Sequence, residues 1–337
     1  MRAIDIRADG GTDMGMGHIV RCVALAEMLR EKFDVKFILQ ETDTNVFAYI
    51  ESQGFQVTRI PRTKKFDTES TYIVDYLRQN SLVVLDGYHF KTDYQKAIKS
   101  AGHFLVAIDD LHQWDQLADI VINHGGYVDA GQYHCAPSTK LLLGYKYLLL
   151  RKEFYSSQKR ESISSIQSIT LSMGAADINN LTLRFAEWLL DHDKVSSINL
   201  LLSKINPHFA TILERTQHEK KITIHLDLGA TALIALIQST DILICPASTI
   251  SLEGCALGVF ILTGTTASNQ INNCNSLVEA GAALSLGDLN SCTKQKLLQG
   301  INSFCDDLPS AQKQLESQGK IVDRQTIHRI QSAFDQA

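Results

Sequence analysis

A glycine-rich loop near the amino terminus has the sequence Arg7-Ala8-Asp9-Gly10-Gly11-Thr12-Asp13-Met14-Gly15-Met16-Gly17-His18-Ile19-Val20-Arg21-Cys22. It follows an apolar-alternating run at residues 3–6, which predicts a strand, and it leads into residues 23–30, which are good helix formers. Glycines allow a ligand to approach the backbone closely, and a helix N-terminus offers N–H groups that favour an anion. The stretch therefore predicts a strand, loop and helix of an α/β protein, with a loop that suits an anion.

The loop matches neither of the common phosphate-binding motifs. A dinucleotide fingerprint needs a third glycine where this chain has Val20, and a P-loop needs Gly-Lys-Ser/Thr where it has Gly15-Met16-Gly17. What remains is a histidine beside a glycine-lined floor. Because histidine is the side chain best suited to moving protons near neutral pH, His18 is a candidate general base. The alternative is a helix-terminal histidine bonded to nearby backbone.

Composition favours an ordinary globular protein. The length of 337 residues favours two domains, and the net charge of −5 without a basic stripe argues against nucleic acid as a partner. No apolar run reaches the roughly 18 residues that span a bilayer, and no signal-peptide pattern precedes the first strand. Seven cysteines without a Cys-x-x-Cys pair indicate reduced thiols, most of them small core residues. We therefore expect a cytoplasmic protein without stable membrane insertion.

Strands and helices alternate along the chain in two halves. Continuous apolar strands between helices predict parallel sheets covered on both faces, with ligands beyond the carboxyl ends of the strands. The alternation predicts an N-terminal Rossmann-like domain at 1–150 and a C-terminal one at 151–337, whose last helix could pack back on the first domain. Two similar halves joined by one linker suggest a cleft between them. Polar residues follow several strands of the first half: Asp9, Asp86, Tyr88, Asp109 and Asn123.

Five local expectations can be checked directly. We expect a helix at residues 71–79, and we expect the strand at residues 120–122 to close the first half. Residues 143–154 are expected to connect the halves, and helices are expected to fill the chain after residue 270. Ser248 or Thr249 is expected to cap a helix that runs to about Leu257.

Three stretches together resemble a known enzyme family. They are Gly15-x-Gly17-His18-x-x-Arg21-Cys22 after Arg7-x-Asp9, Leu143-Gly144-x-x-Tyr147-x-Leu149-Leu150-Arg151-x-x-Phe154, and Ser248-Thr249-x-x-x-Glu253-x-x-x-Leu257-Gly258 followed by Ser268-Asn269-Gln270. They resemble the UDP-2,4-diacetamido-2,4,6-trideoxy-β-L-altropyranose hydrolases of pseudaminic acid biosynthesis. The resemblance runs over nearly the whole chain. It implies an α/β protein of GT-B type, with two Rossmann-like domains whose parallel sheets face each other across a cleft.

The resemblance also implies a reaction and a substrate. Water attacks the anomeric carbon of a UDP-linked 2,4-diacetamido-2,4,6-trideoxyhexose, UDP leaves, and the configuration inverts. Because UDP is a good leaving group once its charge is balanced, the protein supplies charge stabilisation and an oriented water, with no cofactor. The histidines are scattered and show no ligand spacing, so no metal site is predicted.

In the first half the resemblance makes His18 the general base. Gly17 would help to hold the diphosphate, and Tyr88 would be the active-site tyrosine of the family's Asp-x-Tyr. Arg21 lies three positions after His18, on the same helix face, and either contacts substrate or pairs with Asp9 or Asp86. Asp9 or Asp13 could orient the imidazole, but capping the glycine-rich turn is the role favoured for both. Asp86 could instead cap a strand end, and the roles of Asp109, Asp110 and His124 stay open.

In the second half the resemblance implies a nucleotide site. The helix N-terminus at Ser248 and Thr249 would receive the diphosphate, and Glu253 would bond the ribose hydroxyls. Asn269 and Gln270 resemble sugar-binding amides. The structural alternatives are a plain N-cap for Ser248, a solvated carboxylate for Glu253 and helix capping for Asn269.

The chain departs from the family pattern at three places, Gly174-Ala175, Pro246-Ala247 and Leu257-Gly258-Val259-Phe260. These differences bear on the diphosphate contacts and allow a related enzyme with a different sugar. A GT-B glycosyltransferase with a UDP-sugar donor, a hydrolysing UDP-sugar 2-epimerase and a sugar-nucleotide binding protein remain alternatives. Release of UDP from a UDP-sugar separates the enzymes from the binding protein.

Overall fold

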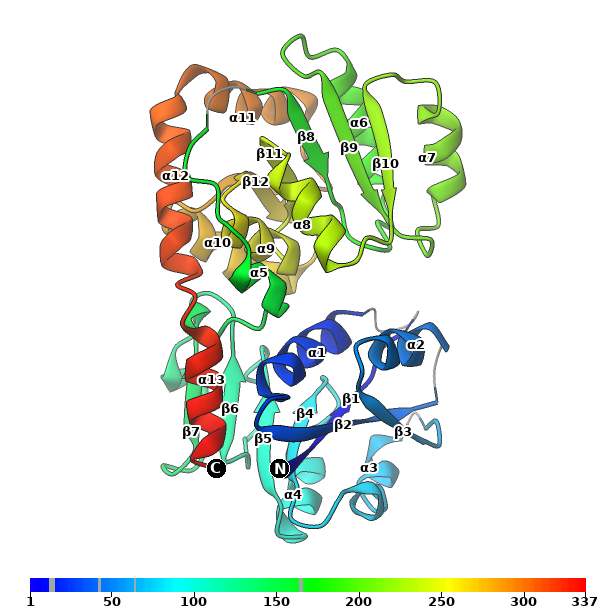
Figure 1. The fold of residues 1–337 in the computed structure, drawn as a ribbon, viewed down its shortest axis with the longest axis vertical. Coiled ribbons are helices and arrows are strands. Elements are labelled where there is room, and N and C mark those ends of the chain that lie inside the picture. The colour runs from blue at the N-terminus through cyan, green and yellow to red at the C-terminus, as the bar shows by residue number, and fades with distance from the viewer. Residues whose placement is uncertain (12–15, 42–43, 64, 164–165) are drawn as a thin grey trace. The chain divides into compact units, whose positions relative to one another are not determined.

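Two parallel sheets organise the chain, one in each of the two units into which it divides (Figure 1). The structure is a computed structural model that describes residues 1–11, 16–41, 44–63, 65–163 and 166–337. Unit 1 comprises residues 1–152 and 324–337, and unit 2 comprises residues 153–323. The α/β class expected from the sequence is confirmed.

Unit 1 contains a seven-stranded sheet in the order β3-β2-β1-β4-β5-β6-β7. Its strands are β1 (Arg2–Ala8), β2 (Phe33–Gln40), β3 (Gln56–Ile60), β4 (Leu82–Asp86), β5 (Phe104–Ile108), β6 (Ile120–Asn123) and β7 (Lys140–Leu143). Its helices are α1 (Gly17–Leu29), α2 (Thr44–Ser52), α3 (Phe66–Glu69), α4 (Thr92–Ser100) and α13 (Thr326–Asp335), with 3₁₀ turns η1 (Ile73–Tyr76), η2 (Ala130–Gln132) and η3 (Tyr145–Tyr147). Helix α1 packs beside α2 and α13, whereas α3 packs beside α4, and helices cover both faces of the sheet (Figure 1). Every residue of β4 is therefore buried, which is why its sequence is a continuous apolar run up to its last residue.

Unit 2 contains a six-stranded sheet in the order β10-β9-β8-β11-β12-β13. Its strands are β8 (Ser168–Leu171), β9 (Ser197–Leu202), β10 (Ile222–Leu226), β11 (Ile242–Pro246), β12 (Phe260–Thr265) and β13 (Leu284–Asp288). Its helices are α6 (Leu181–Leu190), α7 (Phe209–Thr216), α8 (Ala230–Gln238), α9 (Thr249–Leu257), α10 (Ile271–Glu279), α11 (Lys294–Asp306) and α12 (Leu308–Ile321), with the 3₁₀ turn η4 (Ser268–Gln270). Helix α5 (Lys152–Ser156) lies at the junction of the units. Ile169, Ile198 and Ile244, from three neighbouring strands, are fully buried in the core of unit 2.

In both sheets the strand order reverses at one point, because the first strands of the unit are added on one side of the initial strand and the later strands on its other side. The change falls between β1 and β4 in unit 1 and between β8 and β11 in unit 2. The pairing of β1 with β4 places Ala8 beside Asp86. The loops that follow two such strands diverge to opposite faces, and the space beyond their carboxyl ends is where parallel sheets bind ligands. The residues that follow β1 and β4, and β8 and β11, therefore occupy positions suited to a site.

Two edge strands differ from the sequence expectation. Strand β7 (Lys140–Leu143) follows β6, so residues 120–122 do not close the first sheet and Leu143 belongs to a strand and not to the connection. Strand β13 lies among the helices expected after residue 270. Only Leu142 and Leu286 are buried in these two strands, because an edge strand is covered less than a central one. Strand β13 therefore lacks the continuous apolar run of the central strands, whereas β7 has a run of three leucines that is too short to be told from the connection expected to begin at Leu143.

The helix expected at residues 71–79 is only the 3₁₀ turn η1 (Ile73–Tyr76). Beyond it Leu77 is extended, and the backbone N–H of Arg78 donates to the carboxylate of Asp5 at 2.7 Å. The side chain of Arg78 also donates to Asp5 at 2.8 Å and to Asp34 at 2.6 Å. A contact with residues more than 40 positions away thus ends the turn, and no local pattern encodes it.

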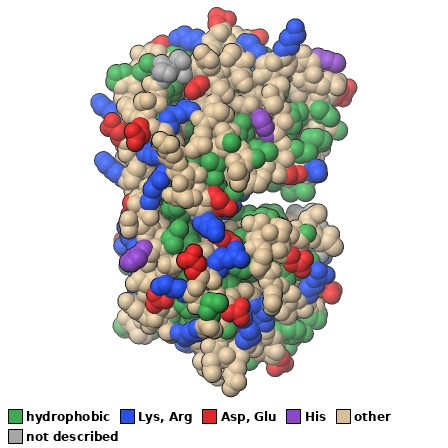
Figure 2. Space-filling view, viewed as in Figure 1, with side chains coloured by type: hydrophobic (Ala, Val, Ile, Leu, Met, Phe, Trp, Pro, Cys, Tyr) green, Lys and Arg blue, Asp and Glu red, His purple; other side chains and the backbone are tan. Residues whose placement is uncertain are grey.

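The cysteines are free thiols, as the sequence indicated. Five of the seven are buried: Cys22, Cys245, Cys255, Cys274 and Cys292. Among the described residues, no helix combines the length and apolar character needed to cross a bilayer. On the face drawn in Figure 2, Lys and Arg side chains alternate with Asp and Glu side chains, and the described residues there form no continuous basic stripe.

Candidate active site

The predicted base His18 lies at the switch point of the first sheet. It is the second residue of α1, which follows β1, and its side chain is buried. Its ring nitrogen Nδ1 lies 2.7 Å from Oδ1 of Asp86, the last residue of β4. Arg21 Nη2 lies 3.0 Å from the same ring nitrogen, so Nδ1 contacts both a carboxylate and a guanidinium. In the tautomer with the proton on Nδ1, the ring donates to Asp86 and Nε2 is the nitrogen that can accept a proton.

Asp86 is fully buried and ionised. Burial by itself would raise its pKa, but the Arg21 guanidinium and the His18 ring hold the pKa of this carboxyl well below its usual range. Arg21 Nε donates to Oδ2 at 2.6 Å and Nη2 donates to Oδ1 at 2.5 Å. Of the roles considered for Arg21, the structure shows the pair with Asp86.

Arg21 also reaches a second carboxylate. Its Nη1 donates to Oδ2 of Asp110, two residues beyond β5, at 3.0 Å. Cys22 Sγ contributes a further contact to Asp86 Oδ2 at 3.3 Å. The side chains that follow β1, β4 and β5 therefore converge at adjacent strand ends, which are far apart in the sequence.

Asp9 does not contact the His18 ring among the bonds that the structure describes. Both of its carboxylate oxygens bond the buried guanidinium of Arg7, at 2.6 Å each, and Oδ1 accepts the backbone N–H of Gln40 at 3.0 Å. Arg7 also donates to the fully buried Glu69 at 2.7 Å. The carboxylate that contacts His18 is therefore Asp86, and the orienting role considered for Asp9 does not apply. The alternative residue Asp13 lies outside the described residues.

Two further predicted residues border His18. Tyr88 lies two residues beyond β4, is 41% exposed, and meets the His18 ring edge-on with ring centroids 4.8 Å apart. A Cβ built on Gly17 would meet none of the described residues within 4 Å, so they leave open space at the start of α1. His18 therefore has an exposed aromatic ring and an uncrowded helix start beside it.

His124 and Asp109, whose roles the sequence left open, have structural bonds. Nδ1 of His124 accepts the backbone N–H of Leu149 at 3.0 Å. Burial and the positive charge of Arg21 lower the pKa of His124 to about 4, so the ring is neutral near pH 7. Asp109 accepts the backbone N–H groups of Leu111 and His112 and so stabilises the turn after β5.

In unit 2 the predicted nucleotide residues lie at the carboxyl ends of β11 and β12. Helix α9 begins directly after β11, with Ser248 as its N-cap residue, as the sequence predicted, but the Ser248 side chain makes no capping bond. Ser248 and Thr249 are half-buried. Asn273 of α10 donates to the backbone carbonyl of Ala247 at 2.9 Å, which fixes the turn before α9. An N-terminus at the switch point, with a hydroxyl not used for capping, suits an anion.

Glu253 is not the solvated carboxylate that was the alternative for this residue. It lies in the second turn of α9 and is 4% exposed. Asn269 is exposed in η4, whose N-cap is Ala267, so helix capping does not explain it either. The side-chain oxygen of Gln270 accepts the backbone N–H of Thr266 at 2.8 Å and is thus used within its own loop.

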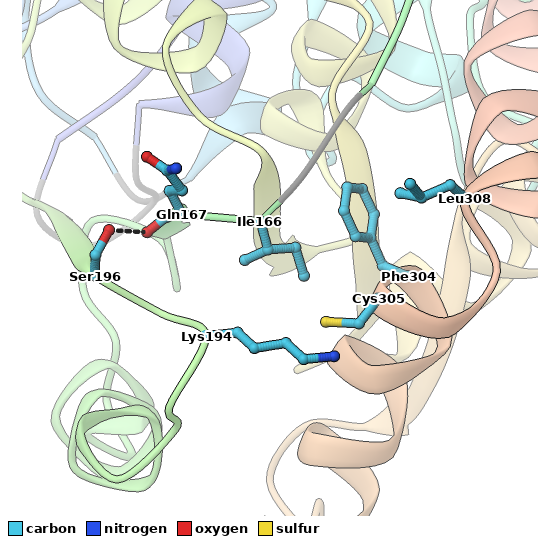
Figure 3. A pocket seen from close by; sticks show the side chains of 7 residues that line it. All are labelled: Ile166, Gln167, Lys194, Ser196, Phe304, Cys305 and Leu308. Carbon is cyan, nitrogen blue, oxygen red and sulfur yellow. Dashed lines mark hydrogen bonds between the residues drawn. The ribbon is translucent and has the colours of Figure 1, made fainter.

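A separate cavity of about 560 Å³ lies elsewhere in unit 2 (Figure 3). It is lined by Ile166, Gln167, Lys194, Ser196, Phe304, Cys305 and Leu308. Four of these residues, Ile166, Gln167, Lys194 and Ser196, precede β8 and β9, so the cavity is at the amino edge of the sheet. Ligands of parallel sheets bind at the carboxyl edge. Lys194 and Cys305 extend toward each other across it (Figure 3), but burial raises the pKa of the Cys305 thiol, which disfavours a nucleophilic thiolate.

Comparison with known proteins gives distant relatives. No protein-family model matches the chain. An uncharacterized protein of Methanocaldococcus jannaschii is 28% identical over 271 residues, which are 76% of this chain and 54% of that protein. The chain thus spans about half the length of that relative. The spore coat polysaccharide biosynthesis protein SpsG of Bacillus subtilis is 22% identical over 338 aligned positions, which cover 97% of this chain and 96% of that protein.

Solved structures establish the fold. The spinosyn rhamnosyltransferase SpnG superposes with a TM-score of 0.71 at 12% identity, covering 99% of this chain and all of that one. MurG of Acinetobacter baumannii gives 0.65 at 13% identity over 100% of both chains, and MnaA of S. aureus, solved with UDP, gives 0.65 at 12% identity over 98% and 95%. Identities this low are informative about the fold alone. The GT-B type of fold, which the sequence resemblance implied, is confirmed.

Proposed function

We propose that this protein is a hydrolase that releases UDP from a UDP-linked 2,4-diacetamido-2,4,6-trideoxyhexose. The observation that carries the proposal is His18, whose Nδ1 is fixed by the buried Asp86 while the exposed Tyr88 lies beside the ring. The GT-B fold supports a nucleotide-sugar substrate, since MnaA was solved with UDP. The relative SpsG, named for polysaccharide biosynthesis, supports a role in making an unusual surface sugar. Free cysteines suit a reducing compartment, and we place the reaction in the cytoplasm.

In the proposed reaction His18 activates water. Nε2 takes a proton from the water while the water oxygen forms a bond to the anomeric carbon. The bond from that carbon to the diphosphate oxygen breaks, and its electron pair leaves with UDP. The imidazolium that forms is stabilised by the carboxylate of Asp86 at 2.7 Å from Nδ1.

The two units have different tasks in this proposal. Unit 1 is the catalytic domain, with His18 and Tyr88, and unit 2 is the nucleotide-binding domain. Ser248 and Thr249 at the start of α9 bind the diphosphate, and Glu253 bonds the ribose hydroxyls. Asn269 and Gln270 contact the sugar. Gly17 assists at the diphosphate, and Arg21 acts through Asp86.

Isotope labelling tests which bond breaks. In ¹⁸O-labelled water we expect the label on the anomeric oxygen of the released sugar and none on UDP, because water attacks carbon. A single displacement also predicts that the first sugar released is the inverted anomer, seen by NMR before mutarotation, and that a chelator does not slow its appearance. Label in the UDP phosphate, or retained configuration, would contradict this mechanism.

Glu253 tests the nucleotide site. We expect Glu253→Ala to weaken UDP binding by about 1–3 kcal/mol, measured by calorimetry, because the ribose hydroxyls lose a charge-assisted hydrogen bond. Glu253→Gln, which keeps the volume of this buried side chain, separates the lost charge from a cavity in the α9 packing. Unchanged UDP affinity in both variants would place the nucleotide elsewhere.

A GT-B glycosyltransferase is the second candidate, because SpnG, which shares the fold, is a glycosyltransferase. Incubation with UDP-sugars in buffer distinguishes the two. A hydrolase releases UDP at full rate with water alone, whereas a transferase needs an acceptor. A binding protein would retain the UDP-sugar intact.

A further inference from the structure

The carboxylate of Asp86 has four hydrogen-bond contacts, from three different side chains. Its Oδ1 bonds His18 Nδ1 and Arg21 Nη2, and its Oδ2 bonds Arg21 Nε and Cys22 Sγ. A bidentate pair between one arginine and one carboxylate is electrically neutral. If Arg21 had no other partner, His18 would therefore lie beside a neutralised pair, which stabilises a protonated ring weakly.

Asp110 changes this balance. Its Oδ2 accepts from Arg21 Nη1 at 3.0 Å, and its Oδ1 is buried without a hydrogen-bond partner among the described residues. The single positive charge of Arg21 is thus divided between two carboxylates. One negative charge of the cluster is left uncompensated while His18 is neutral.

The remaining groups around the pair add no charge. The ring of His124, from the loop after β6, is neutral near pH 7 because burial and Arg21 lower its pKa to about 4. Burial and Asp86 raise the pKa of the Cys22 thiol, which therefore stays protonated. Tyr88, from the loop after β4, contacts the His18 ring edge-on. The described groups that set the field at His18 are therefore Asp86 and Arg21, whose Nη2 lies 3.0 Å from the ring nitrogen Nδ1, and Asp110.

We propose that Asp110 is a positioning residue. It partly neutralises the positive charge of Arg21, so that the negative charge of Asp86 can stabilise a protonated His18. When the ring accepts a proton, the cluster passes from one net negative charge to neutrality. The protonated state is stabilised without any movement of the carboxylates, because their oxygens are already fixed by Arg21. This inference rests on the proposed role of His18 as the base.

The test measures the His18 ring directly, without substrate. The ring titration is followed by ¹H–¹⁵N NMR, with the His18 signals assigned by their loss in His18→Gln. We expect Asp110→Asn to move the midpoint of this titration to lower pH by about 0.5–1 unit, because the imidazolium loses negative charge nearby. Asp110→Glu restores the charge and is expected to remain close to the wild type. Asp93→Asn, which removes one exposed carboxylate from α4 of the same unit, is the matched control and should leave the midpoint unchanged.

With substrate, the acid limb of the kcat/KM profile is expected to move by the same amount in Asp110→Asn. An unmoved NMR midpoint would overturn the proposal, and so would an equal shift in Asp110→Glu, which would indicate a packing effect. Asp110→Ser provides a smaller neutral variant if the asparagine variant does not fold. If the midpoint moves but no UDP-sugar is hydrolysed, the role of Asp110 stands and the proposed function fails.

Discussion

The His18→Asn variant is expected to turn over UDP-sugar about 10²–10⁴-fold more slowly than the wild type, the range typical of a lost general base. Asparagine cannot take a proton from water at neutral pH, but it keeps a polar side chain at the start of α1. Affinity for UDP should stay nearly unchanged, because the side chains proposed to bind the nucleotide belong to unit 2 and the substitution leaves Gly17 in place. Steady-state rates and UDP calorimetry measure the two quantities separately.

The matched control is His103→Asn. His103 is as buried as His18, at 8% exposure, but its Nδ1 contacts the backbone carbonyl of Ser81 and not a carboxylate. We expect its turnover to remain near the wild type. Normal turnover in His18→Asn would remove His18 from the mechanism, and equal losses of turnover and UDP binding would make it a phosphate contact.

The Asp86→Asn variant is expected to lose both activity and stability. An amide does not fix the Nδ1 proton of His18 as a carboxylate does, so turnover should fall by about 10²–10⁴-fold with little change in KM. Arg21 would lose its bidentate partner, and breaking a buried ion pair costs about 3–5 kcal/mol. Urea unfolding measures this loss, and Asp34→Asn, which removes an exposed partner of Arg78, should cost at most about 1 kcal/mol.

The stability difference between wild type and Asp86→Asn should depend on pH. The pKa of Asp86 is lowered in the folded protein, so its ionised form contributes stability that is fully present above the unfolded pKa of about 4. That contribution is lost as the pH falls through the folded pKa. We therefore expect the two unfolding free energies to differ most above about pH 4 and to converge below it. A difference independent of pH would mean that the Asp86 charge is not what stabilises the fold.

The sequence predicted the elements of the fold from local patterns. Buried central strands such as Leu82–Asp86 are continuous apolar runs because helices cover both faces of the sheet, and that periodicity is visible without any tertiary contact. The edge strand β13 was not predicted because it is only partly covered and has no continuous apolar run. Strand β7 has three consecutive leucines, but a run this short does not by itself distinguish a strand from a connection. Local sequence patterns also predicted that His18 lies at the start of one helix and Ser248 at the start of another, and the structure has both.

The sequence by itself determined the α/β alternation, the glycine-rich loop and the candidate base His18. The tertiary structure decided which carboxylate serves that base. Asp9 is nine positions from His18 in the chain, yet Arg7 holds it in a separate buried network, while Asp86, 68 positions away, bonds the ring. The order β1-β4-β5 brings the carboxyl ends of distant strands together, and only this order places Asp86 and Asp110 on either side of Arg21. Strand order depends on long-range packing of the sheet, which no local periodicity encodes.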